Sequence, residues 1–483
     1  MTPILRNLAI AAAVLAGFTG AVLVVLVIAF DLRVEPAGSG VPLIFSFGDP
    51  DDHFSALEES RTRQRSIAQA TGRPASRTTA ADVTTGTTPR ATPAATLPYW
   101  TDFRGPNRDG HYAEMMIRTD WPGTGLEPLW SQPIGGGYAS FVVAGGRAFT
   151  IEQRRGREVV AAYDVETGRE FWNHTWDAHF QETMGGPGPR ATPTWHEGRL
   201  YALGATGALW CLDDETGAVL WERNILADGD AANLAWAMSA SPLIVDEVVV
   251  VLPGGPDGWS VAAYDRLTGH VAWHVLNDVQ GYTSPMLATI GGLRQILVVT
   301  AERVAGLRVE DGHVLWDHPW VVSTVPNMAQ PLMIGDTQVF LSASYGKGAM
   351  LLELSRNGDS FTVDTVWQNG RMKNRFSSSV LRDGYIYGLD NAILACLDAA
   401  TGELMWKGGR YGYGQLLLAG EHLVIVTERG DLVLVRATPE SHQEVAGFRA
   451  IEGKTWNVPA IADGRILVRN TREMAAFDLR PGA

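Results

Sequence analysis

Cysteine is scarce in this chain of 483 residues, which holds two, Cys211 and Cys396, far apart in the sequence. They form no CxxC pair, so they define neither a zinc site nor a disulfide framework. The eleven histidines include no HExxH motif and no tight ligand pair, which argues against a metal site. No GxSxG motif supports an activated serine either. The sequence therefore predicts no bound metal and identifies no catalytic residue.

Positive charge is also in short supply, with 39 Lys and Arg against 53 Asp and Glu, a formal net charge of −14. A surface this acidic repels phosphate backbones, so nucleic acid is excluded as a partner. What the chain has in abundance is turn-forming and aromatic residues, with 53 Gly, 25 Pro and 16 Trp. Such a composition is globular and rich in turns.

Long apolar runs are rare as well, and the one that matters is at the N-terminus, residues 8–30, in which Thr19 is the sole polar side chain. A helix of that length crosses about 30 Å of hydrocarbon. Arg6 precedes it and acidic residues follow, which predicts an N-terminus in the cytoplasm. We expect residues 1–30 to be a single-pass anchor in the inner membrane, with the rest on the periplasmic or extracellular side; a cleaved signal peptide is the alternative.

Residues 31–98 change in character and are rich in Thr, Ala, Pro and Arg without a hydrophobic period. Such a stretch buries too little apolar surface to offset its ordering entropy. We expect a flexible, disordered tether, with a short helix possible over residues 55–70.

From residue 99 onward a repeat dominates, with Asp, then Thr-Gly, then Trp at fixed spacing. The strongest copies are YDVETGREFW (163–172), LDDETGAVLW (212–221), YDRLTGHVAW (264–273), LRVEDGHVLW (307–316) and LDAATGELMW (397–406). With degenerate copies, the aromatic residues that end them are Trp130, Trp172, Trp221, Trp273, Trp316, Trp367, Trp406 and Phe448. Their spacing, mostly in the forties, is that of a four-stranded propeller blade.

Each part of the motif has a physical role in that fold. Glycine supplies the positive φ of a tight turn, and the aromatic residue on the outer strand is large enough to staple one blade to the next. After Phe448 the chain holds three strands and no fourth with an aromatic residue, whereas the strand near 126–134 has no partner. The sequence therefore predicts an all-β fold over residues 99–483, an eight-bladed propeller of four-stranded antiparallel blades, with the 126–134 strand completing the last blade.

These repeats, together with FRGPNRDG (103–110) and GKTWN near the C-terminus, resemble the pyrroloquinoline quinone (PQQ)-like repeat superfamily of bacterial β-propellers. The resemblance covers residues 99–483. That superfamily includes quinoprotein dehydrogenases and the propeller scaffold of outer-membrane barrel assembly, so it implies the fold more firmly than the function.

The quinoprotein dehydrogenases typically have adjacent cysteines over the cofactor and a calcium site of Glu, Asn and Asp. Cys211 and Cys396 are not adjacent and occupy the same repeat position four blades apart. We expect both to fill the core as small buried residues, too distant to pair.

The best candidate pocket is the funnel formed by the segments that lead into the innermost strands. Aromatic and basic residues there could stack on a flat ligand and pair with its carboxylates. The candidates for cofactor binding are Arg190, Trp236, Asn327, Lys373, Asn374, Arg375, Trp456 and Asn457, with Tyr282, Gln330, Tyr411, Tyr413 and Gln415 beside them. The alternative is that these side chains bond free backbone groups and solvate the channel mouth. No carboxylate lies in these segments to hold calcium, although Glu182, Asp228, Asp230 and Asp278 are in nearby loops.

Two functions remain open. The first is a membrane-tethered, extracytoplasmic propeller that acts as a non-catalytic binding or scaffold module for a protein, peptide or glycan of the cell envelope. The second is a PQQ-dependent alcohol or sugar dehydrogenase with calcium and the quinone in the funnel. The missing cysteine pair and calcium carboxylates favour the first, which needs no cofactor.

Overall fold

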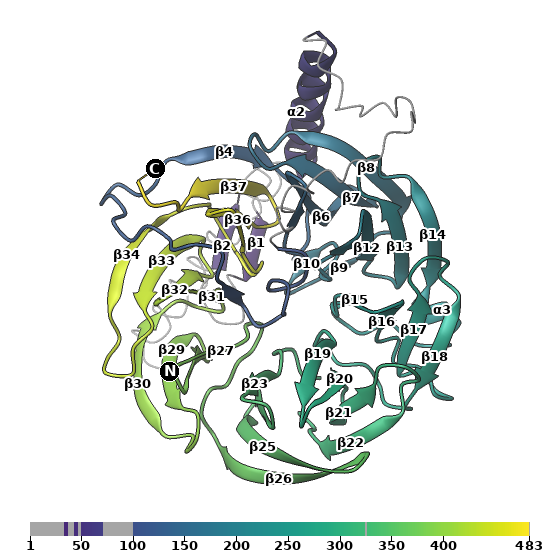
Figure 1. Ribbon diagram of the computed structural model, residues 1–483. Coiled ribbons are helices and arrows are strands. Elements are labelled where there is room, and N and C mark those ends of the chain that lie inside the picture. Colours follow the sequence, from purple (N-terminus) through teal and green to yellow (C-terminus); the bar gives the residue numbers. More distant parts are fainter. Residues whose placement is uncertain (1–32, 37–42, 47–49, 71–99, 324–325, 483) are drawn as a thin grey trace, which may run out of the picture.

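The computed structural model describes residues 33–36, 43–46, 50–70, 100–323 and 326–482. Eight antiparallel sheets stand around a central axis, with the chain running round the ring from blue to yellow (Figure 1). This is the predicted eight-bladed propeller of four-stranded blades. The seventh blade gains a short parallel strand, β3 (His111–Tyr112), beside its innermost strand.

The first four blades follow one another in chain order. Blade 1 consists of β5 (Val142–Ala144), β6 (Arg147–Arg154), β7 (Arg157–Asp164) and β8 (Glu170–Asp177). Blade 2 consists of β11 (Thr194–His196), β12 (Arg199–Leu203), β13 (Ala208–Asp213) and β14 (Val219–Asn224). Blade 3 consists of β15 (Leu243–Val245), β16 (Val248–Val251), β17 (Val261–Asp265) and β18 (Val271–Val275). Blade 4 consists of β19 (Met286–Ile290), β20 (Leu293–Val299), β21 (Arg303–Arg308) and β22 (Val314–Pro319).

The remaining blades repeat the pattern. Blade 5 consists of β23 (Leu332–Ile334), β24 (Gln338–Ala343), β25 (Gly348–Asn357) and β26 (Ser360–Asn369). Blade 6 consists of β27 (Val380–Arg382), β28 (Tyr385–Asp390), β29 (Ile393–Asp398) and β30 (Leu404–Arg410). Blade 7 consists of β31 (Gln415–Ala419), β32 (His422–Val426), β33 (Asp431–Arg436) and β34 (Glu444–Arg449). Blade 8 consists of β35 (Ala460–Ala462), β36 (Arg465–Arg469), β37 (Glu473–Asp478) and β4 (Pro128–Pro133).

The ring closes in blade 8, as the sequence predicts. Its three inner strands come from the C-terminus and its outer strand, β4, comes from the N-terminal side of the propeller. β4 pairs antiparallel with β37, and Trp130 lies opposite Ala476 in the register. This pairing removes the free sheet edge that an open ring would expose.

The predicted staples join neighbouring blades through hydrogen bonds as well as packing. In five blades the indole N–H of the outer strand donates to a backbone carbonyl in the turn of the next blade, at 2.8–3.0 Å: Trp130 to Val165, Trp172 to Asp214, Trp221 to Arg266, Trp367 to Ala399 and Trp406 to Thr438. Trp273 and Phe448 lie against glycines of the turn that they face, Gly312 and Gly125. Trp316 differs, because its indole bonds Gln295 of its own blade.

The regular spacing of Asp, Gly and Trp within each repeat follows from the hydrogen bonds that fix each turn. In blade 1 the Asp164 carboxylate accepts hydrogen bonds from the backbone N–H groups of Glu166 and Thr167, which fixes the turn. Gly168 then adopts φ +66°, and a Cβ at this position would come within 2.5 Å of the Trp130 ring. Glycine is therefore required for the backbone conformation and for the close approach of the indole.

The two cysteines are buried and free, in blades 2 and 6. Cys211 lies opposite Trp221 and Cys396 opposite Trp406 in the strand registers. Burial raises the pKa of the Cys211 thiol to about 11 and that of Cys396 to about 12. Inert, protonated thiols of this kind fill the core, as expected.

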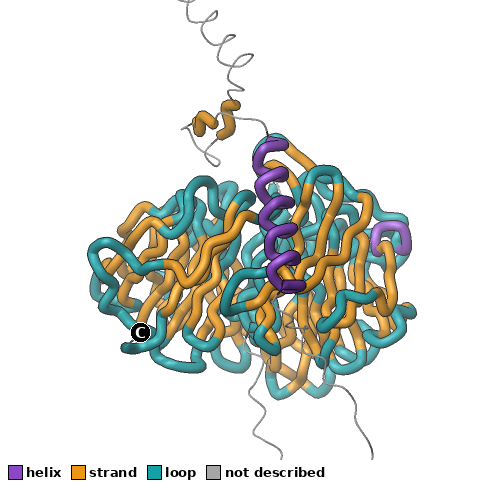
Figure 2. The backbone as a smooth tube through the Cα atoms, turned by 90° about the horizontal axis from the view of Figure 1, so that it is seen from above, coloured by secondary structure: helices purple, strands orange, loops and turns teal. Residues whose placement is uncertain are grey.

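Helix α2 (Pro50–Ala70) lies within the stretch expected to be a tether, and it packs on the outer wall of the ring. Figure 2 shows it, in purple, standing along the side of the propeller. Buried Arg61 donates to the carbonyl oxygen of Pro133 at 2.8 Å and pairs with Glu170 at 3.5 Å. The short helix considered over residues 55–70 is thus present as part of α2. Leu57 and Arg61 are four residues apart and bury one shared face.

The other described elements are short. Strand β1 (Arg33–Pro36) pairs antiparallel with β2 (Leu43–Ser46), β9 (Gln181–Glu182) pairs with β10 (Gly186–Pro187), and α3 (Ile225–Asp228) follows β14. Across the described segments of the chain, no helix combines the length and the hydropathy needed to cross a membrane. The expected anchor, residues 8–30, lies outside the described residues.

Candidate functional site

The segment Trp100–Gly110 crosses the ring interior and joins blades on opposite sides of it. Arg104 and Arg108 are both buried. Arg104 donates to the backbone carbonyls of Ser379 and Leu416, in blades 6 and 7. Arg108 donates to the carbonyls of Ser241 and Pro285, at the inner strands of blades 3 and 4, and pairs with Asp102 at 3.0 Å. Desolvation outweighs this pairing and raises the pKa of the Asp102 carboxyl.

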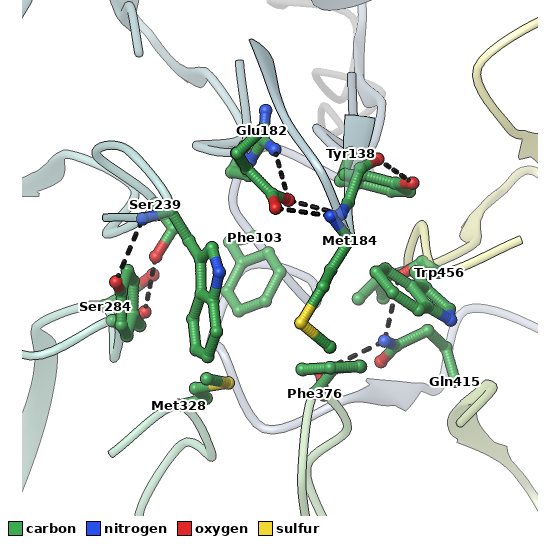
Figure 3. A pocket seen from close by; sticks show the side chains of 15 residues that line it. Phe103, Tyr138, Glu182, Met184, Ser239, Ser284, Met328, Phe376, Gln415 and Trp456 are labelled. Carbon is green, nitrogen blue, oxygen red and sulfur yellow. Dashed lines mark hydrogen bonds and ion pairs between the residues drawn. The ribbon is translucent and has the colours of Figure 1, made fainter. Parts of the chain in front are cut away.

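This crossing segment forms the floor of a pocket in the central funnel, because Phe103 beside Arg104 is part of the pocket wall. The pocket has a cavity volume of about 150 Å³ and is partly open to solvent. It is lined by Phe103, Tyr138, Glu182, Met184, Gly185, Arg190, Trp236, Ser239, Tyr282, Ser284, Met328, Phe376, Gln415, Trp456 and Val458 (Figure 3). Aromatic rings and two methionines dominate this lining.

Three of the predicted cofactor-binding residues, Arg190, Trp236 and Trp456, line this pocket, as do Tyr282 and Gln415. The Trp236 ring lies 5.7 Å from that of Tyr282 between centroids, and burial raises the pKa of the Tyr282 phenol. On the other side Trp456 lies 4.6 Å from Phe376. The two aromatic groups form facing walls.

The other predicted residues lie elsewhere. Asn327 and Asn457 are buried and donate to the backbone carbonyls of Ala329 and Ala139, each at 2.9 Å. Asn374 is buried and accepts from the hydroxyls of Ser342 and Ser379. These three amides tie the inner segments together, which is the structural role that the sequence analysis left open as the alternative.

The two predicted cations of blade 6 also have partners away from the pocket lining. Lys373 pairs with Asp390 at 3.0 Å. Arg375 is held between the rings of Tyr345 and Tyr413, with its guanidinium carbon 4.8 Å from each centroid, and it donates to both hydroxyls. It stands next to Phe376, whose ring does line the pocket.

Sequence reasoning selected charged, amide and aromatic residues of the funnel segments, and it missed several other residues of the lining. Ser239, Ser284, Met328 and Phe376 all sit in segments leading to inner strands, so their positions could have been found by the same rule. Tyr138 leads into β5 in the same way. The hairpin residues Glu182 and Met184, and the floor residue Phe103, carry no repeat signal that would place them in the funnel.

The two charged residues of the lining neutralise each other. The Glu182 carboxylate accepts hydrogen bonds from the backbone N–H groups of Met184, at 2.6 Å, and Gly185, and pairs with Arg190 at 3.4 Å. Arg190 also donates to the carbonyls of Gly186 and Gly188 and stacks over the Phe180 ring. Burial lowers the pKa of Arg190. Neither charge is left for a ligand without breaking these contacts.

The lining fits calcium and PQQ poorly. Calcium takes six to eight oxygen ligands, whereas Glu182 is the one carboxylate of the lining and already accepts from Met184, Gly185 and Arg190. Over the described residues no cluster of three or more His, Cys, Asp or Glu side chains could hold a metal ion. A flat quinone could stack on Trp236 or Trp456, but its carboxylates would meet an Arg190 that is engaged by Glu182. The donor set here is therefore not that of a calcium-bound quinone.

Comparison with solved structures finds the same fold in proteins of low sequence identity. BamB from Moraxella catarrhalis matches with a TM-score of 0.52 at 15% identity, over 71% of this chain and 95% of that one. Quinohemoprotein alcohol dehydrogenase from Comamonas testosteroni matches with a TM-score of 0.58 at 13% identity, over 80% of this chain and 81% of that one. The computationally designed Ika8 protein matches with a TM-score of 0.52 at 11% identity, over 73% and 99%. At such identities the likeness shows the fold alone.

Comparison with curated protein sequences gives no match. Comparison with family models does: the PQQ-repeat model described as "Outer membrane protein assembly factor BamB" matches residues 155–408, a little more than half of the 483-residue chain. The matched region runs from the β6–β7 turn of blade 1 to β30 of blade 6. The chain therefore belongs to this family of PQQ-like repeat β-propellers, that of outer membrane protein assembly factor BamB.

Proposed function

We propose that this protein is a non-catalytic binding or scaffold module, tethered to the inner membrane, whose propeller holds a protein partner in the cell envelope. The observation that carries the proposal is the chemistry of the funnel pocket. Six aromatic rings and two methionines line it. Its two charged residues, Glu182 and Arg190, pair with each other. A pocket lined in this way suits an apolar group.

The family supports a protein partner, because its model is described as an assembly factor. The pocket supports a peptide over a glycan as the group that enters. Sugars present many hydroxyls that need free polar partners, whereas the Gln415 NH2 group already donates to the carbonyls of Phe376 and Trp456, which leaves its oxygen alone to accept. Met184 and Met328 add flexible, polarizable surface that adapts to different apolar side chains.

The alternative is a PQQ-dependent dehydrogenase, and its support is the propeller fold shared with quinohemoprotein alcohol dehydrogenase together with the aromatic walls formed by Trp236, Trp456 and Phe376. Its weakness is the donor set, since the pocket has no free carboxylates for calcium and no free cation for the carboxylates of the quinone. The scaffold function is therefore the better supported of the two.

Placement at the inner membrane rests on the apolar run 8–30 and its flanking charges. Carbonate extraction of membranes that contain the full-length protein tests it. Release of the protein into the soluble fraction would contradict a retained anchor.

Site-specific photo-crosslinking tests the scaffold function. A photoreactive residue at position 239, whose serine lines the pocket, should trap a protein in intact cells, and Trp456→Ala should abolish the adduct. The same residue at position 271, on an outer strand where Val271 is exposed, is the control. Stoichiometric uptake of PQQ with calcium, followed by alcohol-dependent dye reduction, would overturn the proposal in favour of the dehydrogenase.

A further inference from the structure

The chain segment that connects blade 1 to blade 2 forms a hairpin at the edge of the funnel pocket. It consists of β9 and β10, with Glu182 opposite Gly186 and Gln181 opposite Pro187 in the register. Its base is fixed, because the N–H of Gly188 donates to the carbonyl of Phe180 and the N–H of Tyr138 donates to the carbonyl of Pro189. The tip, Thr183–Gly185, projects over the space that the aromatic walls enclose.

Two side chains from the neighbouring blades 1 and 8 meet this tip. Lys454, in the loop before β35, donates to the carbonyl oxygen of Met184 at 2.8 Å. The Tyr138 hydroxyl donates to the carbonyl of Gly185. The tip is thus bridged from blade 2 to the blade 8 side by a few hydrogen bonds, two of which are made to main-chain carbonyls. Lys454 is partly exposed, so solvent can reach at least one of these bonds.

The Met184 side chain points from the tip into the pocket, toward Phe376 on the opposite wall (Figure 3). In the same view Phe103 lies to one side of the Met184 side chain and Trp456 to the other. A thioether among aromatic rings makes favourable sulfur–ring contacts. The chain therefore places one of its own unbranched apolar side chains against the empty space of the pocket, where a larger ligand would meet it.

We infer that Met184 is a resident occupant of the pocket, and that the β9–β10 hairpin is a lid which an apolar side chain of the partner must displace. The inference rests on the proposed function of the pocket and specifies the group that the pocket takes. That group is a neutral, unbranched apolar side chain of methionine-like length on a peptide. A lysine side chain of similar length is disfavoured, because Lys454, which lies over the Trp456 ring, places positive charge beside the opening.

Self-occupation lowers the apparent affinity of the pocket, since a ligand binds the open fraction alone. Glycines at 185, 186 and 188 suit such a lid, because Gly186 and Gly188 adopt φ values of +81° and +89° that other residues rarely reach. A partner that presents the right side chain replaces the thioether and frees the tip. Recognition and lid opening are then one event.

The test uses full-length protein, the uncharged fluorescent probe N-phenyl-1-naphthylamine, and a peptide that copies residues 181–187, acetyl-QETMGGP-amide. Met184→Ala should bind the naphthylamine about tenfold more tightly than the parent, as expected if the lid is closed nine-tenths of the time. Lys454→Ala should move the affinity in the same direction. The peptide should displace the probe from Met184→Ala, and its methionine-to-alanine copy should not.

Two control variants distinguish the effect of the lid residue Met184 from that of a residue in the pocket wall. Met328→Ala removes a methionine of the pocket wall and should weaken probe binding, whereas Met116→Ala, at a residue that is 78% exposed, should change nothing. Equal melting temperatures for all variants exclude unfolding as the cause.

The outcomes distinguish the two proposals. If the probe binds and Trp456→Ala abolishes binding, but Met184→Ala has no effect and the peptide does not compete, the pocket function stands and the lid inference is overturned. If no variant binds the probe, both are overturned.

Discussion

The indole nitrogen of Trp130 donates a hydrogen bond to the carbonyl oxygen of Val165 at 2.8 Å, and this bond joins the closing strand of blade 8 to the turn of blade 1. Strand β4 is separated from its blade partners by more than 300 residues of chain, so closing the ring costs more loop entropy than forming any other blade. The seam where the two ends of the propeller meet is therefore the place where one indole contributes most to holding the ring together.

Replacing Trp130 tests this role. Trp130→Phe keeps most of the packing and removes the hydrogen bond, which should lower the free energy of unfolding by about 1 kcal/mol. Trp130→Ala should lower it by about 3–5 kcal/mol. Urea denaturation followed by circular dichroism measures both. Trp316→Phe is the matched control, because that indole bonds within its own blade. Hydrogen exchange should show loss of protection in β4 and β37 for the Trp130 variants; equal loss in Trp316→Phe would contradict a special role for the seam.

Gly168, in the turn of blade 1, packs against the ring of Trp130. Gly168→Ala places a methyl group within 2.5 Å of the Trp130 ring at a backbone φ of +66°. Gly146→Ala, at φ +75° with open space around the new Cβ, carries the backbone strain alone. We expect a loss of about 1–2 kcal/mol at Gly146 and about 3 kcal/mol at Gly168, where overpacking is added. Equal melting temperatures for the two variants would show that the contact with Trp130 is unimportant.

The fold was predictable because the repeat encodes it locally. The Asp164 carboxylate, the Gly168 turn and the Trp172 indole each act within a few residues of chain or on the adjacent blade, so a spacing rule captures them. The closing strand was predictable by counting, since one blade lacked an aromatic strand and β4 was left over.

The crossing segment and the docked helix follow no such rule. Arg104, Arg108 and Arg61 are fully or almost fully buried, and in a sequence they read as surface charges. Each is buried because its partners, backbone carbonyls and buried carboxylates, come from distant blades. The sequence predicted part of the pocket lining and missed the rest for a related reason. Met184 enters the funnel from a hairpin that has no counterpart in the repeat, so its position depends on tertiary structure.

Arg61 should hold helix α2 to the seam. Its guanidinium pairs with Glu170, donates to the carbonyl of Pro133 and lies over the Tyr163 ring. Arg61→Met keeps a long side chain and removes the charge. We expect a loss near the lower end of the roughly 3–5 kcal/mol that breaking a buried pair costs, because Glu170 keeps its pair with Arg154. Arg63→Met is the control, since Arg63 is exposed and pairs with Glu59. Trypsin should cleave the 50–70 segment faster in Arg61→Met; unchanged cleavage would show that α2 is held by other contacts.

Glu158 gives the propeller a measurable pH dependence. Its side chain is buried between blades 1 and 2, where one carboxylate oxygen accepts from the backbone N–H of Ala205 at 2.9 Å. The other has no hydrogen-bond partner among the described residues. Burial raises the pKa of this carboxyl from 4.5 to about 7, since desolvation penalises the charged form.

A carboxyl group with a raised native pKa binds its proton more tightly in the folded than in the unfolded chain. Its contribution to stability is complete below pH 4.5 and is lost as the pH rises from 4.5 through 7, by up to about 3 kcal/mol. Glu158→Gln stays neutral and keeps the acceptor for Ala205, so it should match the parent at pH 4.5 and be more stable at pH 8. Urea denaturation at both pH values measures the difference, with Glu127→Gln at an exposed position as the control. If the difference between Glu158→Gln and the parent is the same at pH 4.5 and pH 8, folding does not raise the pKa of Glu158 and blades 1 and 2 leave its carboxylate hydrated.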